Sequence, residues 1–321
     1  MAHPKFNRRP SSYLRDIPSF VAKEKSVEAF GLQWLIHKKT QLDSFTGLTI
    51  TQDRLKRMLG PLYYNLDGKV MLEVGCGAGR FTEVLIKNNL FLTSFDLSIA
   101  VLANYENNRN QNSLRILQAS IADLPFDAEQ FDIVFCPGVI QHTPDPTSTI
   151  QNLYSHVKPG GWLVFDQYRY NFSSFMKITW LLRLLLKRTT PEFGLAFTNL
   201  LVKFWLPIHK KASNNRLIEI LLFRISPITS HYSGYPEMSE AHQKSWAQLN
   251  THDNLTDYYK KCTTTKALKT KIKKLGAIHQ FFCIMPYTIE VRCQKPTIGS
   301  NMDSSDNPTI SDLRKSKITS G

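Results

Sequence analysis

A glycine-rich turn directly after a short apolar segment constrains the fold of this 321-residue chain more than any other feature. The apolar segment is 70–74, and Gly75, Gly77 and Gly79 follow it. The next stretch, 80–88, carries its apolar residues at helical spacing. An apolar run that ends in conformationally free residues and leads into an amphipathic segment is typical of a strand, a tight turn and a helix.

Apolar runs and helical segments continue to alternate along the chain. A second apolar run ends at Asp96, and residues 99–105 again have helical spacing. Further strand-like runs follow at 114–119, 131–136, 161–166, 278–285 and 287–293. Because strands alternate with helices, we predict an α/β fold with a doubly wound sheet. The last two runs meet at Pro286, and as a hairpin they would complete a seven-stranded sheet.

Each glycine of the turn has a physical task. Gly75 lets the chain leave the strand sharply, Gly77 lets the backbone approach a ligand without a Cβ in the way, and Gly79 permits close packing of the helix start. Asp96 ends the next strand, where a carboxylate can accept hydrogen bonds from both hydroxyls of a ribose. This combination predicts an adenosine-type cofactor.

The spacing of the turn distinguishes between two such cofactors. The dinucleotide fingerprint requires its third glycine where Arg80 stands, which weakens the case for a nicotinamide-dependent oxidoreductase. Glu73 precedes the turn, and its carboxylate would repel a pyrophosphate but suit an amino group. S-adenosylmethionine, which carries an amino acid end, meets that requirement.

The motifs from 70 to 168 resemble those of the class I S-adenosylmethionine-dependent methyltransferases, type 11 branch. Residues 72–82 resemble motif I, and 122–126 resemble the loop in which an acidic residue, here Asp123, meets the adenine amino group. The family's remaining motifs are matched by 131–135, 141–146 and 153–163. The resemblance implies a Rossmann-like fold with a helical cap or lid insertion and no metal. It implies that the cofactor contacts Glu73, Gly75, Cys76, Gly77, Gly79, Asp96, Leu97, Ala122, Asp123 and Gly138.

Three further segments suggest a subgroup and an acceptor class. Residues 30–34, 40–44 and 246–253 resemble a subgroup of methyltransferases that act on bacterial surface polysaccharides and secondary metabolites. Some of those relatives begin with a cysteine-rich zinc segment, whereas no cysteine precedes Phe30 here. We therefore expect a small-molecule, glycan or lipid-linked acceptor. A non-catalytic scaffold that only binds the cofactor is the alternative from another class.

A hydroxyl acceptor would need a general base near the methyl group. His142 is the candidate, because it follows the fourth strand and has an ordinary pKa near 6.5. The alternative is that His142 only shapes the loop before Pro144. Tyr168, His231 and Asp253 are weaker candidates for the same role.

On this interpretation the chain divides into five parts. These are a flexible N-terminal arm at 1–25, N-terminal helices and the cofactor-binding core at 26–170, a helical lid insertion at 171–245, a C-terminal core helix and strands at 246–293, and a disordered tail at 294–321. Within the fourth part we predict one lysine-rich amphipathic helix over 255–275, ended by Gly276.

The predicted lid is apolar and basic. Between 172 and 228 nine Lys and Arg residues outnumber two acids, Glu192 and Glu219. Such a lid could contact an anionic membrane surface or a lipid-linked acceptor. The alternative, slightly favoured by the sequence, is a helical subdomain whose apolar faces pack on each other with the lysines outside.

Charge and cysteine content bear on location and partners. The formal net charge is +14, but no nucleic-acid-binding motif accompanies it, so a solvated basic surface is favoured over nucleic acid. Five scattered cysteines argue for a reducing compartment. No apolar run has the length of a spanning helix or follows the pattern of an export signal. We expect a cytoplasmic protein that can lie against a membrane.

Overall fold

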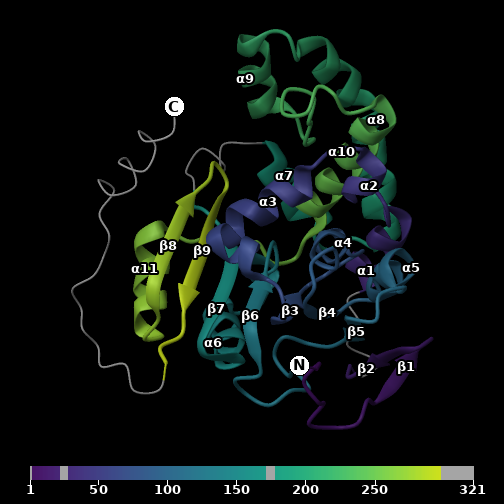
Figure 1. The fold of residues 1–321 in the computed structure, drawn as a ribbon. Helices are drawn as coiled ribbons and strands as arrows, with labels where there is room; N and C mark the ends of the chain where they lie inside the picture. The colour runs from purple at the N-terminus through teal and green to yellow at the C-terminus, as the bar shows by residue number, and fades with distance from the viewer. Residues whose placement is uncertain (1, 22–27, 171–177, 298–321) are drawn as a thin grey trace, which may run out of the picture.

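One sheet with helices on both faces forms the centre of the protein (Figure 1). The computed structural model describes residues 2–21, 28–170 and 178–297. Within these residues nine strands form the sheet in the order β1-β2-β5-β4-β3-β6-β7-β9-β8. Their bounds are β1 Ser12–Leu14, β2 Ile17–Ser19, β3 Val70–Val74, β4 Phe91–Asp96, β5 Leu114–Gln118, β6 Phe131–Cys136, β7 Val157–Tyr168, β8 Ile278–Ile284 and β9 Thr288–Gln294.

The predicted α/β fold class is confirmed, and the sheet is larger than expected. Strands β3 to β7 run parallel to one another, and β9 lies antiparallel to both β7 and β8. These seven strands are the ones predicted; β1 and β2 add two more beyond β5. Because β3 pairs with both β4 and β6, the strand order reverses beside β3. In open α/β sheets the carboxyl edge at such a reversal is where ligands bind.

Strand β3 is buried on both faces, which explains its continuous apolar run. Val70, Leu72 and Val74 point into a core cluster with residues of α6 and α11, whereas Met71 points into a second cluster with α3 and α4. Glu73 shares the α4 side with Met71, because side chains alternate along a strand. The bounds of these helices are α3 Ile50–Leu59, α4 Arg80–Leu85, α6 Pro146–Ser155 and α11 Thr265–Lys274.

A layer of helices lies over the carboxyl edge of the sheet (Figure 1). Helix α10 packs on both α7 and α8, and the α8–α10 contact is built on Val202, Leu206 and Ala247. The layer consists of α7 Ile178–Leu186, α8 Pro191–Ala212, α9 Arg216–Ile225 and α10 Glu240–Thr256. Two helices precede the first core strand, α1 Glu28–Ile36 and α2 Asp43–Thr46, and α5 Val101–Asn108 lies between β4 and β5. Among the described helices none combines the length and the apolar character that crossing a membrane requires.

The prediction of a single helix over 255–275 is wrong. Helix α10 ends at Thr256, and α11 begins after Thr264, whose hydroxyl caps it by accepting the N–H of Ala267. Between the two helices, Thr263 exchanges backbone hydrogen bonds with Tyr168 and Tyr170 at the end of β7. These tertiary hydrogen bonds outweigh local helical propensity.

The N-terminal arm is ordered over most of its predicted length. Strands β1 and β2 form an antiparallel hairpin, and the N–H of Phe20 donates to the carbonyl of Gln118 on β5. The side chain of Ile17 is 1% exposed and packs with Val101 and Ile116. Strands of three residues give too little periodicity to be predicted. Residues 22–25 of the predicted arm lie outside the described residues.

The predicted disordered tail begins within the sheet. Gln294 is the last residue of β9, and the N–H of Lys295 donates to the carbonyl of Gly161. Residues 298–321 lie outside the described residues.

Replacement of Ile17 tests whether the N-terminal hairpin is docked. Ile17→Ala should lower the free energy of unfolding by about 2–5 kcal/mol, because it removes a buried side chain from a packed cluster. Tyr13→Ala is the matched control on the same hairpin, since Tyr13 is 63% exposed. Its effect should stay within about 0.5 kcal/mol in urea denaturation. Equal small effects of both variants would show that the arm does not pack on the sheet.

Candidate active site

A cavity of about 1900 Å³ lies between the carboxyl edge of the sheet and the helical layer. The sheet side is formed by the turn after β3, the ends of β4 and β6 and the end of β7. The other side is formed by residues of α3, α7, α8, α9 and α10 and by the turn between β8 and β9. Of the residues that the resemblance implies, Gly75, Cys76, Gly77, Asp96, Leu97, Ala122 and Gly138 line this cavity.

The glycine turn adopts a backbone that other residues rarely take. Gly75, Gly77 and Gly79 have φ values of +68°, +52° and +89°. A Cβ on Gly79 would also lie 2.3 Å from Oδ1 of Asn104 on α5. Gly79 itself does not line the cavity; its place is the contact between α4 and α5, as the sequence predicts for a packing glycine.

Asp96 fixes the turn from the neighbouring strand. One carboxylate oxygen accepts the N–H of Gly77 at 3.0 Å, and the other accepts the N–H and the hydroxyl of Ser98 at 2.9 and 2.8 Å. A carboxylate offers about four acceptor positions, so capacity is left for a ligand hydroxyl. Burial raises the pKa of Asp96 above its ordinary value.

Glu73 lies beneath the turn instead of in the cavity. It is 1% exposed, and one carboxylate oxygen accepts the hydroxyls of Thr82 and Ser94, each at 2.6 Å. The other oxygen has no hydrogen-bond partner among the described residues. Burial raises the pKa of Glu73 to about 7. In this arrangement Glu73 ties α4 to β4 and positions the turn.

Asp123 is placed away from the cavity. Its side chain is 71% exposed and forms a two-pronged ion pair with Arg8, at 2.8 and 2.9 Å. The neighbouring Ala122 does line the cavity. Arg8 belongs to the N-terminal arm at 1–25, for which the sequence analysis predicts a flexible structure. The Arg8–Asp123 pair was therefore not predicted.

Arg80 lines the cavity. From the sequence it was considered only because it occupies the position of the third glycine in the dinucleotide fingerprint, and its side chain was given no role. Its guanidinium donates to the hydroxyl of Thr51 at 2.9 Å and to the side-chain carbonyl of Gln41 at 3.4 Å, and it stacks on the ring of Trp246. No carboxylate among the described residues forms an ion pair with it. Burial, and then the like charge of Arg54, lower its pKa to about 9. A half-buried guanidinium that lines a cavity is suited to an anionic ligand group.

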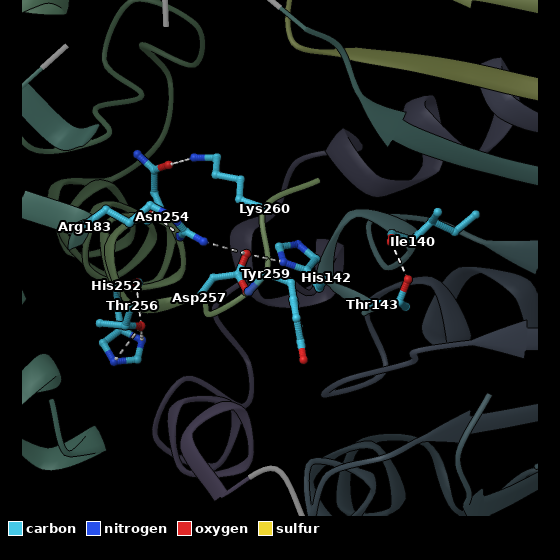
Figure 2. Close-up of polar contacts among 10 residues, drawn as sticks. All are labelled: Ile140, His142, Thr143, Arg183, His252, Asn254, Thr256, Asp257, Tyr259 and Lys260. Atoms are coloured by element: carbon cyan, nitrogen blue, oxygen red, sulfur yellow. Dashed lines mark hydrogen bonds and ion pairs between the residues drawn. The ribbon is translucent and has the colours of Figure 1, made fainter. Parts of the chain in front are cut away.

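His142 lines the cavity and contacts a carboxylate from a distant part of the chain. Its Nδ1 lies 2.5 Å from Oδ2 of Asp257. Figure 2 shows this carboxylate between the imidazole of His142 and the guanidinium of Arg183, whose nearest nitrogen is 3.9 Å from it. Burial lowers the pKa of His142, but the hydrogen bond to Asp257 and the charge of Asp253 outweigh it, so the pKa is raised above 6.5.

The weaker base candidates separate into two places. Tyr168 and Asp253 line the cavity near His142: the Tyr168 ring lies edge-on to the imidazole at 5.5 Å, and Lys260 lies 5.7 Å above the same ring. Burial raises the pKa of Tyr168 well above its usual range, so its phenol stays protonated. His231 lies beside Arg80, and burial lowers its pKa to about 4. Asp257 and Arg183 were missed because they lie far from His142 in sequence.

The buried cysteines have no chemical role in this arrangement. Burial raises the pKa of the Cys76 and Cys136 thiols well above the ordinary value. Both therefore remain neutral thiols, as expected for small apolar side chains in a core.

Comparison with known families agrees with this geometry. A family model described as a methyltransferase domain matches residues 72–165, which run from β3 to β7. This part of the chain is therefore similar to a methyltransferase domain. The matched residues contain the glycine turn, Asp96 and His142.

Individual relatives match only parts of their length or have low identity. The protein named "Ubiquinone biosynthesis O-methyltransferase" in Coxiella burnetii (strain Dugway 5J108-111) is 36% identical over 113 residues, 35% of this chain and 48% of that protein. A protein of the same name in Pseudomonas fluorescens (strain Pf-5) is 28% identical over 183 residues, 54% and 75% of the two chains. The chain thus spans about half the length of the first of these relatives. A magnesium protoporphyrin IX methyltransferase from Synechocystis PCC 6803 has 12% identity and a TM-score of 0.43, over 81% of this chain and 84% of that one.

Replacement of Glu73 by Gln tests the burial of its charge. The pKa of Glu73 is raised from 4.5 to about 7 in the folded protein. Between these pH values the Glu73 carboxyl is protonated in the folded state and ionised in the unfolded chain. The ionised form therefore opposes folding, and the wild type should lose stability relative to Glu73→Gln as pH rises from about 4.5 to about 7, by up to about 3 kcal/mol. Thermal unfolding of both proteins across this range measures the difference. A difference that does not change with pH would contradict the buried position.

Proposed function

We propose that this chain is an S-adenosylmethionine-dependent methyltransferase that transfers the methyl group to a hydroxyl oxygen of a small-molecule acceptor, with His142 as general base. The observation that carries the proposal is that His142, which is hydrogen-bonded to Asp257, lines the same cavity as the glycine turn. Proximity and orientation supply much of the rate of methyl transfer, so a shared cavity is the essential requirement.

The residues of the sheet side fit the cofactor. The positive φ of Gly77 brings bare backbone to the cavity, and Asp96 retains acceptor capacity for a ribose hydroxyl. Arg80, which forms no ion pair within the part of the chain that the structure describes, would supply a positive charge for the carboxylate of the amino acid end. Leu97, Ala122 and Gly138 would form the wall for the adenosine. When bound, the cofactor supplies a methyl group already activated on a sulfonium.

His142 and Asp257 would handle the proton of the acceptor. A neutral imidazole takes a proton from a hydroxyl, and the Asp257 carboxylate at 2.5 Å stabilises the resulting imidazolium and fixes the ring orientation. Burial favours this pairing, because the Asp257 side chain is 2% exposed. The curated relatives support oxygen as the acceptor atom, since they are named O-methyltransferases of ubiquinone biosynthesis.

The cellular setting is part of the same proposal. All five cysteines lie in the described residues and none forms a disulfide, which supports a cytoplasmic location. The acceptor hydroxyl could also belong to a glycan or a lipid, because the cavity is large enough for more than the cofactor.

Transfer of a labelled methyl group tests the activity. The full chain is incubated with methyl-labelled S-adenosylmethionine and three sets of hydroxyl acceptors: simple phenols, free sugars and a bacterial lipid extract. We expect alkali-stable label on oxygen in one set. Label in none, with the cofactor still bound, would support the non-catalytic scaffold instead.

Replacement of Arg80 tests the seat of the amino acid end. Arg80→Met should weaken binding of S-adenosylhomocysteine by about 10- to 150-fold, the range for a charge-assisted hydrogen bond of about 1.5–3 kcal/mol. Binding of 5′-methylthioadenosine, which lacks the amino acid end, should not change and also shows that the variant is folded. Calorimetric titration measures both ligands. Equal weakening of both would mean that Arg80 only supports the fold.

The pH dependence of turnover tests His142. A base acts when deprotonated, so kcat/KM should fall as pH falls through the raised pKa of His142, with an acidic limb above pH 6.5. Asp257→Asn should move that limb to lower pH and reduce the maximal rate. His142→Gln should remove the limb and cost about 10²- to 10⁴-fold. If His142→Gln keeps both rate and limb, His142 only shapes its loop.

A further inference from the structure

Helix α9 exposes almost all of its apolar side chains. Of its ten residues only Leu222 is buried, at 4% exposure. Its exposed apolar residues are Leu217, Ile218, Ile220, Leu221, Phe223 and Ile225, with exposed fractions from 40% to 79%. In Figure 1 the helix lies at the outer end of the helical layer, away from the sheet. An apolar surface of this kind marks an interaction site.

The neighbouring helices add apolar residues of the same layer. Along α8 the exposed residues Phe193, Leu200, Phe204 and Ile208 recur at intervals of seven or four, which places them on one side of the helix. On α7 the exposed residues are Ile178, Trp180, Leu181, Leu184 and Leu185. The packing of apolar faces favoured by the sequence holds for α8 against α10 but not for α9.

The charge on these helices indicates the partner. Six basic residues in and between α7, α8 and α9 are exposed: Arg188, Lys203, Lys210, Lys211, Arg216 and Arg224. Of these, Lys210 forms an ion pair with Glu240 of α10. Two acids belong to the same segment, Glu192 exposed and Glu219 partly exposed. A second copy of the chain would bring like charges together. Exposed apolar residues mixed with Lys and Arg match the interface of a bilayer that contains anionic lipids.

The apolar helix is continuous with the cavity. Ile220 and Phe223 of α9 line the cavity, and the Phe223 ring lies 6.2 Å from that of Tyr287 in the turn between β8 and β9. His142 and Asp253 line the same cavity. A molecule that enters beside α9 therefore reaches the base without leaving the protein.

We propose that α9 docks into the surface of an anionic membrane and that the acceptor is an amphiphile of that membrane, with a hydroxyl-bearing head that reaches His142. The docking stands on the exposed apolar residues of α9 and on the basic charge of α7, α8 and α9. The acceptor class rests on the proposed function.

Vesicle flotation tests the docking with the full chain. The wild type should float with vesicles of phosphatidylcholine and phosphatidylglycerol, and much less with phosphatidylcholine alone. The variant Leu217→Glu/Leu221→Glu should bind about tenfold or more weakly, because it places two charges in the apolar face. Tyr13→Glu/Tyr64→Glu is the matched control, since it makes the same charge change at side chains 63% and 79% exposed elsewhere. It should float like the wild type.

Three results would overturn the docking of α9. An equal loss of vesicle binding in both variants would show that the added charge acts without a role for α9. If both variants bind vesicles as well as the wild type does, the membrane contact lies elsewhere on the protein. A wild type that stays off the vesicles and sediments as a dimer, dissociated by the α9 variant, would assign the face to a second copy. Binding of S-adenosylhomocysteine should be unchanged in the α9 variant. If the wild type floats but does not bind that ligand, the proposed function fails and the docking stands.

A pair of phenols tests the acceptor class. With these vesicles the wild type should methylate a long-chain alkyl catechol at a kcat/KM at least about tenfold higher than that for catechol. In the α9 variant the KM for the alkyl catechol should rise towards that of catechol, while turnover of catechol stays the same. No preference in the wild type would overturn the membrane-borne acceptor and leave methyl transfer itself in place.

Discussion

The carboxylate of Asp96 accepts the N–H of Gly77, and this hydrogen bond ties the turn after β3 to the end of β4. The turn can exist there because glycine tolerates the positive φ values at 75, 77 and 79. Glu73 supports it from below through Thr82 and Ser94. The floor of the cavity, and with it the place of any cofactor, depends on these few contacts at the point where the strand order reverses.

Two ion pairs and one hydrogen bond hold the rest of the cavity around this floor. Arg54 and Arg57 of α3 pair with Asp166 of β7 and Glu290 of β9, each at 2.8 Å, and so fix α3 over the carboxyl edge. The contact of His142 with Asp257 joins the methyltransferase domain to the segment after α10. Each of the three carboxylates is nearly inaccessible to water, where charged pairs are sensitive to loss of a partner. The helical layer is therefore part of the site and not a cover added to it.

The sequence predicts what local patterns determine. Strand β3 was found at its bounds, because a short, mostly apolar run before a glycine turn has one common structure. The hairpin of β1 and β2 was missed, since its docking depends on Ile17 and on partners about a hundred residues away. The Arg8–Asp123 and His142–Asp257 pairs were missed for the same reason: they join residues 115 apart in the chain. The exposure of α9 follows from tertiary packing, which helical periodicity does not encode.

Calorimetric titration of the full chain with S-adenosylhomocysteine tests the central claim, that the turn and Asp96 form a cofactor seat of the methyltransferase type. We expect S-adenosylhomocysteine to bind in the micromolar range, about −8 kcal/mol, NADH not to bind, and Asp96→Ala to weaken binding by about 1.5–3 kcal/mol. Binding of NADH in place of the sulfur ligand would rule out a cofactor site of this type. So would the absence of binding by either ligand to the folded protein, since the glycine turn would then have only a structural role.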